Sequence, residues 1–222
     1  MTRAEQLSVG VTGALALAAV SAYAIDACGF GIAAGPVSAV AIAGAAALAW
    51  SSHPTGANRT NRADTLLLLA VVGFVFVTIL RFGWPALVPP GRGPDLTHHL
   101  LLVDYIERHR ELVHDRALER SMGEMAHYTP GAHLLAVLLG WWLRVDGLRA
   151  FFPLLAACAA LASGFVFLIA RRLALPAPYA LAAVMLLFLP YRYFYGAFTH
   201  DAFLAQAVAT LFAVASWWAL VV

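Results

Sequence analysis

Apolar residues occur in long blocks that are separated by short polar segments and by one long polar stretch. A helix needs about 20 apolar residues to cross the hydrocarbon of a membrane, and several blocks approach that length. The pattern therefore predicts an all-α, polytopic transmembrane protein with about six spans. The expected spans are residues 7–27, 36–50, 64–82, 150–170, 179–189 and 202–222. A further block at 131–143 is too short for a comfortable crossing and fits a re-entrant or interfacial segment.

The arginines predict how these spans are oriented, because positive residues gather on the cytoplasmic side of a membrane. If block 131–143 does not cross, one side holds Arg3, Arg59, Arg62, Arg171 and Arg172. We therefore expect a cytoplasmic N-terminus and an outer loop at about 83–149. That loop carries seven Arg against eight acidic residues, so it has no positive bias of its own.

The long loop has helical patterns of its own. Apolar residues at 96, 100, 103 and 106 share one helical face, and Asp104 and Arg108 form an i,i+4 pair on the other. We expect an amphipathic helix that starts near Leu96 and lies on the membrane surface. A second polar helix is expected over residues 114–122. The loop also contains six of the eight histidines.

Composition agrees with a membrane protein, since 62% of residues are hydrophobic and only 12% are charged, about half the charge of soluble domains. All 14 basic residues are Arg, which fits either phosphate recognition or a compositional bias of the genome. No basic stripe with interleaved aromatic residues is present, so nucleic-acid binding is not expected. Cys28 and Cys158 lack metal-ligand spacing.

Two aspartates, Asp95 and Asp201, stand at the ends of apolar stretches and are expected on the same outer face. Acidic residues at a membrane face are candidates for function. Each could instead be a helix cap, because Asp before an apolar run is a common helix start. A zinc site formed by Asp95, His98, His99 and His127 is disfavoured, since the adjacent helical residues His98 and His99 point about 100° apart.

The order of polar landmarks in residues 66–222 resembles the GT-C glycosyltransferases. The nearest branch is that of protein O-mannosyltransferases and lipid A aminoarabinose transferases. The landmarks are Asp95, the turn Tyr128-Thr129-Pro130-Gly131, the pair Arg171-Arg172, and Thr199-His200-Asp201. Asp201 follows Asp95 by 106 residues (201 − 95), near the family's usual spacing. One departure is Leu96 after Asp95, where mannosyltransferases usually carry a second acid.

The resemblance implies transfer of a sugar from a polyprenyl phosphate lipid at the outer face of a bacterial inner membrane. It implies that Asp95 is the general base and that Asp201 orients the acceptor or holds a divalent cation. Substrate contacts are then expected from five residues, which are Arg92, His98, His99, Tyr128 and His200.

The chain would form a single membrane domain over 1–222, with an N-terminal helix pair in 1–63 and the GT-C-like part in 64–222. It ends within an apolar block, so it resembles only the N-terminal part of such an enzyme, and its short length argues against independent activity. The alternative is a non-catalytic accessory subunit of a larger complex. Its contact surface would be helices 7–27 and 36–50, because small residues allow close helix approach. A transporter is less favoured, since no span carries a charge at its centre.

Overall fold

The computed structural model describes residues 3–51, 62–89 and 94–221, and every regular element within those ranges is helical. Arg59 and Arg92 lie outside the described residues. The elements are α1 (Arg3–Ala27), α2 (Ala34–Ser51), α3 (Arg62–Gly83), α4 (Pro94–His109), α5 (Arg116–Met122), the 3-10 segment η1 (Gly123–His127), α6 (Gly131–Leu143), α7 (Gly147–Arg172), α8 (Ala177–Leu186), the π-helical segment η2 (Arg192–His200) and α9 (Leu204–Val221).

Four helices in the described part are long and apolar enough to cross a membrane by length and composition, namely α1, α3 from Ala63, α7 and α9. The expected number of six is not confirmed. The apolar part of α2 (Ala34–Leu48) and α8 (Ala177–Leu186) are shorter apolar helices. Helix α6 is also short, and its 13 residues coincide with the apolar block expected at 131–143.

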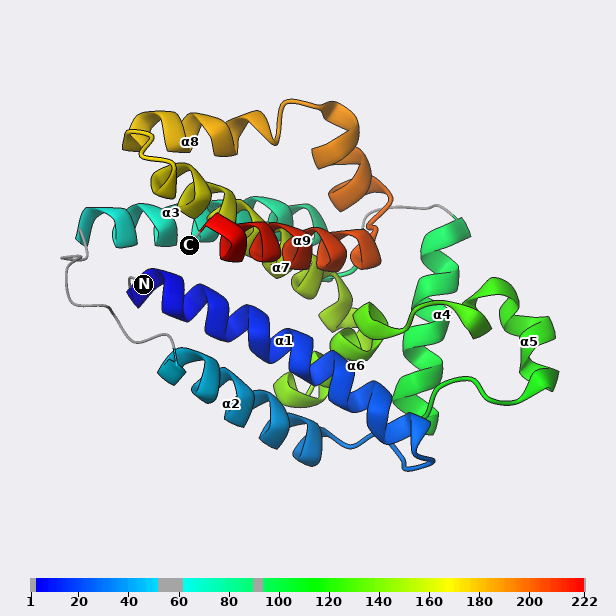
Figure 1. Cartoon of the computed structure of the whole chain (residues 1–222). Coiled ribbons are helices and arrows are strands. Elements are labelled where there is room, and N and C mark those ends of the chain that lie inside the picture. Colours follow the sequence, from blue (N-terminus) through cyan, green and yellow to red (C-terminus); the bar gives the residue numbers. More distant parts are fainter. Residues whose placement is uncertain (1–2, 52–61, 90–93, 222) are drawn as a thin grey trace.

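Helix α7 lies at the centre of the bundle (Figure 1). Within its most apolar 18-residue window, 78% of the residues are buried, against 28% for α1, α3 and α9. It packs against α3, α6, α8 and α9 and buries the aromatic side chains of Phe151, Phe152, Phe165 and Phe167. The three less buried helices therefore present most of their apolar surface outwards, as a protein surrounded by lipid requires.

Helices α1 and α2 form an antiparallel hairpin whose backbones approach closely. A Cβ atom at Gly44 would collide with the side chain of Leu17, and one at Gly13 would collide with that of Leu48. Small residues permit such close packing. The small residues of these two segments therefore allow α1 and α2 to pack on each other, while their contact with another subunit stays a prediction.

Two arginines at the end of α7 fix one end of the bundle. Arg172 donates to both carboxylate oxygens of Glu5 in α1, at 2.6 and 2.7 Å. Arg171 donates to both oxygens of Asp64 in α3, at 3.1 and 2.9 Å. We call this the arginine end, defined by Glu5, Asp64, Arg171 and Arg172.

The opposite end of the bundle carries α4, α5 and η1, and we call it the loop end (Figure 1). The expected amphipathic helix exists as α4, and its Asp104–Arg108 pair forms at 2.9 Å. That the helix lies on the membrane surface stays a prediction, but its apolar face is covered by protein. Val103 and Ile106 are fully buried, because this face packs against α6 and α7. The second polar helix is α5, which begins two residues after the expected start at residue 114.

Candidate functional site at the loop end

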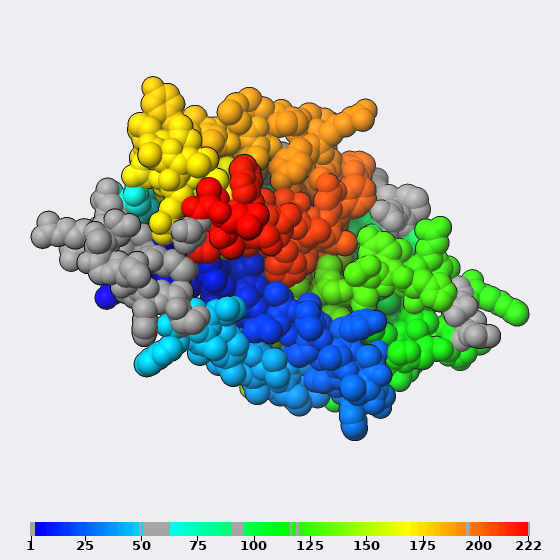
Figure 2. Space-filling model, viewed as in Figure 1, coloured from blue at the N-terminus to red at the C-terminus, as the bar shows by residue number. Residues whose placement is uncertain are grey.

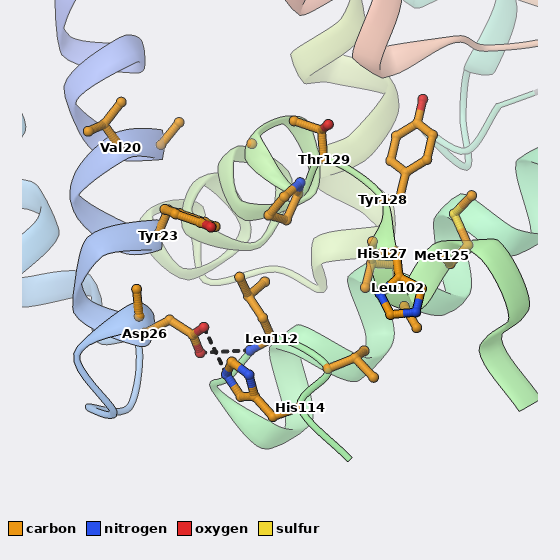
Figure 3. A pocket seen from close by; sticks show the side chains of 16 residues that line it. Val20, Tyr23, Asp26, Leu102, Leu112, His114, Met125, His127, Tyr128 and Thr129 are labelled. Carbon is orange, nitrogen blue, oxygen red and sulfur yellow. Dashed lines mark hydrogen bonds and ion pairs between the residues drawn. The ribbon is translucent and has the colours of Figure 1, made fainter. Parts of the chain in front are cut away.

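A cavity of about 600 Å³ opens at the loop end, between the last turns of α1 and the connection from η1 to α6. In Figure 3, Val20 and Tyr23 of α1 stand on one side, and Met125, His127 and Tyr128 stand on the other. The described lining residues are Ala19, Val20, Tyr23, Asp26, Ala27, Leu102, Leu112, Val113, His114, Met125, Ala126, His127, Tyr128, Thr129, Pro130 and Gly131. Most of this lining is apolar, and its polar groups come from Asp26 at the end of α1 and from the segments that follow α4 and η1.

Asp26 in the last turn of α1 is the carboxylate of this cavity. It is only 4% exposed, and it accepts hydrogen bonds from the Leu112 backbone N–H at 2.8 Å and from His114 Nε2 at 2.9 Å. A carboxylate at a helix C-terminus faces the negative end of the helix dipole and is costly to bury without donors. The two donors offset both effects and attach the α4–α5 connection to α1.

The Asp26–His114 pair has the geometry of a carboxylate that orients an imidazole. Asp26 is buried while the His114 side chain is 60% exposed, and both residues line the cavity (Figure 3). Since Nε2 faces Asp26, Nδ1 is the ring nitrogen that could exchange a proton with a bound molecule. A positioned His–carboxylate pair can bind and polarise a hydroxyl group.

A second polar group lies behind the cavity wall, where α4 meets α6. His99 Nδ1 and His133 Nε2 are 2.9 Å apart, and the two rings are stacked at 5.1 Å. Tyr128 meets both rings edge-on, at 5.0 and 5.6 Å, and also lines the cavity. Burial and, secondly, the neighbouring His99 lower the pKa of His133 to about 3. The His133 ring is therefore neutral at ordinary pH, and its hydrogen bond with His99 joins α6 to α4.

The predicted residues fall into separate places at this end. His99 and Tyr128 are brought together, while His98 is exposed on α4. Asp95 is the second residue of α4, and the position of its side chain lies outside what the structure describes, as does Arg92 altogether.

Asp201 lies in the short connection from η2 to α9. His200 Nδ1 lies 2.7 Å from Asp201 Oδ1, and the two side chains are 59% and 39% exposed. Neither residue is among the described residues that line the cavity. The structure thus pairs these two predicted residues with each other and places the cavity elsewhere.

Sequence reasoning missed Asp26, His114 and His133 as members of these groups. Asp26 carries the same signal that singled out Asp95, because it is an acidic residue at the end of an apolar block. The pairing itself joins residues 88 positions apart and follows no local pattern. Among the described residues, no group of three or more His, Cys, Asp or Glu side chains could hold a metal ion.

We compared the chain with protein families, curated proteins and solved structures, and none of them matches it.

Proposed function

We propose that this chain transfers a sugar from a polyprenyl phosphate lipid to a hydroxyl acceptor, in the manner of the GT-C glycosyltransferases that its sequence resembles. In this proposal the loop end faces outwards and the arginine end faces the cytoplasm of a bacterium. The observation that carries the proposal is the cavity of about 600 Å³ that contains the Asp26–His114 pair.

The size and lining of the cavity suit the sugar. Small-molecule sites commonly measure about 300–1,000 Å³ and combine apolar walls with a few fixed polar groups. Here Tyr23 and Tyr128 offer aromatic surface, while Asp26, His114 and Thr129 offer hydrogen-bonding groups. The apolar wall from α1 would guide a lipid-linked molecule from the membrane into the cavity.

The transfer would make one bond and break another. The acceptor oxygen forms a bond to C1 of the sugar while the bond from C1 to the phosphate oxygen breaks. Polyprenyl phosphate leaves with the electron pair, and the acceptor proton passes to a base. By resemblance Asp95 is that base, while Asp26 and His114 orient the hydroxyl groups of the bound sugar. By resemblance Asp201, which pairs with His200 outside the described cavity lining, would orient the acceptor before it enters the cavity.

The phosphate needs positive charge that the described lining does not supply, because no Arg is among those residues. Arginine is well suited to phosphate because its planar fork can donate two parallel hydrogen bonds. In the proposal Arg92, two residues before the start of α4, provides this contact and His98 supports it.

The test uses the full chain in lipid nanodiscs with radiolabelled undecaprenyl phosphate mannose and undecaprenyl phosphate glucose. Acceptors come from membranes of the source organism that lack this protein. We expect Asp95→Asn to lower transfer by about 10²–10⁴-fold, as loss of a general base does, and Asp26→Asn to lower it by about 10–100-fold, as loss of hydrogen bonds to a charged group does. Asp104→Asn is the matched control, because Asp104 lies on the outer face of α4 and pairs only locally with Arg108.

The proposal fails if neither donor lipid binds, or if the three aspartate variants transfer sugar equally well. A protein that binds no donor and always co-purifies with the same membrane partner would instead be an accessory subunit.

A further inference from the structure

One wall of the loop-end cavity is formed by the chain that follows α4. Leu112, Val113 and His114 of the α4–α5 connection line the cavity. Helix α5 begins two residues later and lies at the outer edge of the molecule, in green in Figure 1 and Figure 2. It packs against η1 and α4, its neighbours along the chain, whereas α1 packs chiefly against α2 and α6. Hydrogen bonds, more than helix packing, therefore connect this wall to α1.

The backbone adopts a left-handed conformation on both sides of this segment. The φ angles of Arg110, at the end of α4, and of Gly123, at the start of η1, are 58° and 55°. At Gly123 nothing lies within 4 Å of an added Cβ atom, so the backbone angle and not close packing favours glycine there. Hinges are commonly a few residues at the ends of elements. We call residues 111–122 the strap and take Arg110 and Gly123 as its hinges.

Asp26 attaches the strap to α1. One carboxylate oxygen accepts from the Leu112 backbone N–H at 2.8 Å, and the other accepts from His114 Nε2 at 2.9 Å (Figure 3). A further hydrogen bond, from the Ile32 N–H to the Arg110 carbonyl oxygen at 2.6 Å, lies at the hinge and not on the strap. A rotation of the strap about Arg110 therefore breaks the two bonds of Asp26 and keeps the third.

Most described residues of the strap are exposed, among them Ala117 and Ser121 of α5. Met122, next to the hinge at Gly123, is buried. Leu112 and Val113 are half-buried over the cavity, and they are the apolar side chains that opening beside Asp26 uncovers. Segments with few buried contacts open at the lowest cost in free energy. The two bonds of Asp26 are thus a large part of what keeps the strap in place.

We propose that the strap is a lid on the loop-end cavity, held shut by Asp26 and opened about Arg110 and Gly123 to admit and release the substrate. This role rests on the proposed function, because it takes the cavity as the site of the donor sugar. His114 belongs to the strap, so its ring meets a bound sugar only while the lid is shut. The bound donor therefore stabilises the shut state, since a ligand favours the conformation that it binds.

Two spin labels measure the position of the strap without any substrate. One is attached to Cys28, which is exposed in the α1–α2 connection, while Cys158 is buried and stays unlabelled. The other is attached to α5 through Ser121→Cys. Pulsed electron double resonance on the full chain in lipid nanodiscs then gives the distances between the labels. We expect one main distance with Asp26 present, and a second, longer one with Asp26→Ala.

The ratio of open to shut lids should rise about tenfold or more in Asp26→Ala, as loss of hydrogen bonds to a charged group implies. His114→Ala removes one of the two bonds and should give a smaller rise. It also provides the test if thermal unfolding shows that Asp26→Ala is not folded. Asp104→Ala is the matched control, because Asp104 pairs with Arg108 on α4, and it should leave the distances unchanged.

A second pair of labels, on Cys28 and on His109→Cys, serves as a reference because residue 109 precedes the hinge. Its distance should stay the same in Asp26→Ala. The proposal is overturned if both label pairs change alike, since the end of α1 would then have loosened, or if neither pair changes in the folded variants. Labels that separate in a protein that binds no donor lipid would refute the transferase and leave the lid. Labels that stay together in an active transferase would refute only the lid.

Discussion

Replacement of Arg172 should be the most damaging change at the arginine end. Its guanidinium donates two short hydrogen bonds, at 2.6 and 2.7 Å, to the carboxylate of Glu5. The Glu5 side chain is 3% exposed, so Arg172→Gln deprives a buried charge of its main compensation. Loss of one partner of a buried ion pair costs about 3–5 kcal/mol, and we expect a loss of this size in the free energy of unfolding.

The neighbouring pairs supply graded controls. Arg171 and Asp64 are 28% and 31% exposed, so solvent partly screens this pair and Arg171→Gln should cost about 1 kcal/mol. Arg108 is 73% exposed, and Arg108→Gln should cost about 0.3–0.5 kcal/mol, the usual value for an i,i+4 pair. The three arginine variants make the same chemical change at pairs of different burial, and Arg171→Gln also removes a hydrogen bond of 2.6 Å to the Leu175 carbonyl oxygen.

Unfolding by sodium dodecyl sulfate in mixed micelles, followed by circular dichroism, measures these free energies. A double-mutant cycle with Glu5→Gln separates the energy of the pair from the cost of the remaining charge. The double variant should be more stable than Arg172→Gln alone, because neither partner then keeps a buried charge. The reasoning is refuted if Arg171→Gln costs as much as Arg172→Gln, since burial would then not set the energy.

Two further changes test other parts of the fold. Gly140→Ala should destabilise the α6–α7 turn by about 1–3 kcal/mol, because its Cβ would lie 2.9 Å from the Val145 carbonyl oxygen and 3.0 Å from Gly147 N. Gly73→Ala is the control, because nothing lies within 4 Å of its Cβ, and it should not destabilise α3 in the same unfolding measurement. Equal losses of stability in the two variants would contradict this packing. The pKa of His133 is lowered to about 3 from an ordinary value of 6.5, so the unfolded chain binds a proton that the folded chain does not, and stability should fall as the pH drops from about 6.5 towards 3, by at most about 1.4 kcal/mol per pH unit. His133→Asn should reduce that slope in thermal unfolding series at stepped pH, and an unchanged slope would mean that another group titrates.

The long helices could be predicted from the sequence because apolar length is a local property. The spans expected at 7–27, 64–82, 150–170 and 202–222 correspond to α1, α3, α7 and α9 with shifts of two to four residues at most ends. The apolar face of α4 was also recognised correctly. The partner of this face was not recognised, because a stripe of apolar residues can pack equally well against lipid and against another helix.

The candidate site was less predictable, because its contacts join distant segments. Asp95 and Asp201 stood out through their neighbours in sequence. Asp26 is recognisable as part of a site only through its hydrogen bonds with Leu112 and His114, which lie in the connection between α4 and α5. His133 was hidden for a related reason: it belongs to an apolar block, and its partner His99 lies on a different helix. No local sequence pattern predicted the π-helical segment η2 at Arg192–His200.

The bond between Glu5 and Arg172 also bears on how the chain is made. The two residues are 167 positions apart, so the first helix leaves the ribosome long before the residue that neutralises its carboxylate. Arg171 and Asp64 repeat this order over 107 positions. During membrane insertion, Glu5 in the first turn of α1 and Asp64 in the first turn of α3 therefore lack their arginine partners until the end of α7 is synthesised. Until then these carboxylates should stay at the water interface. Final packing of the bundle is then a late step of biogenesis, and a nascent chain arrested before Arg171 should keep α1 accessible to modification at Glu5.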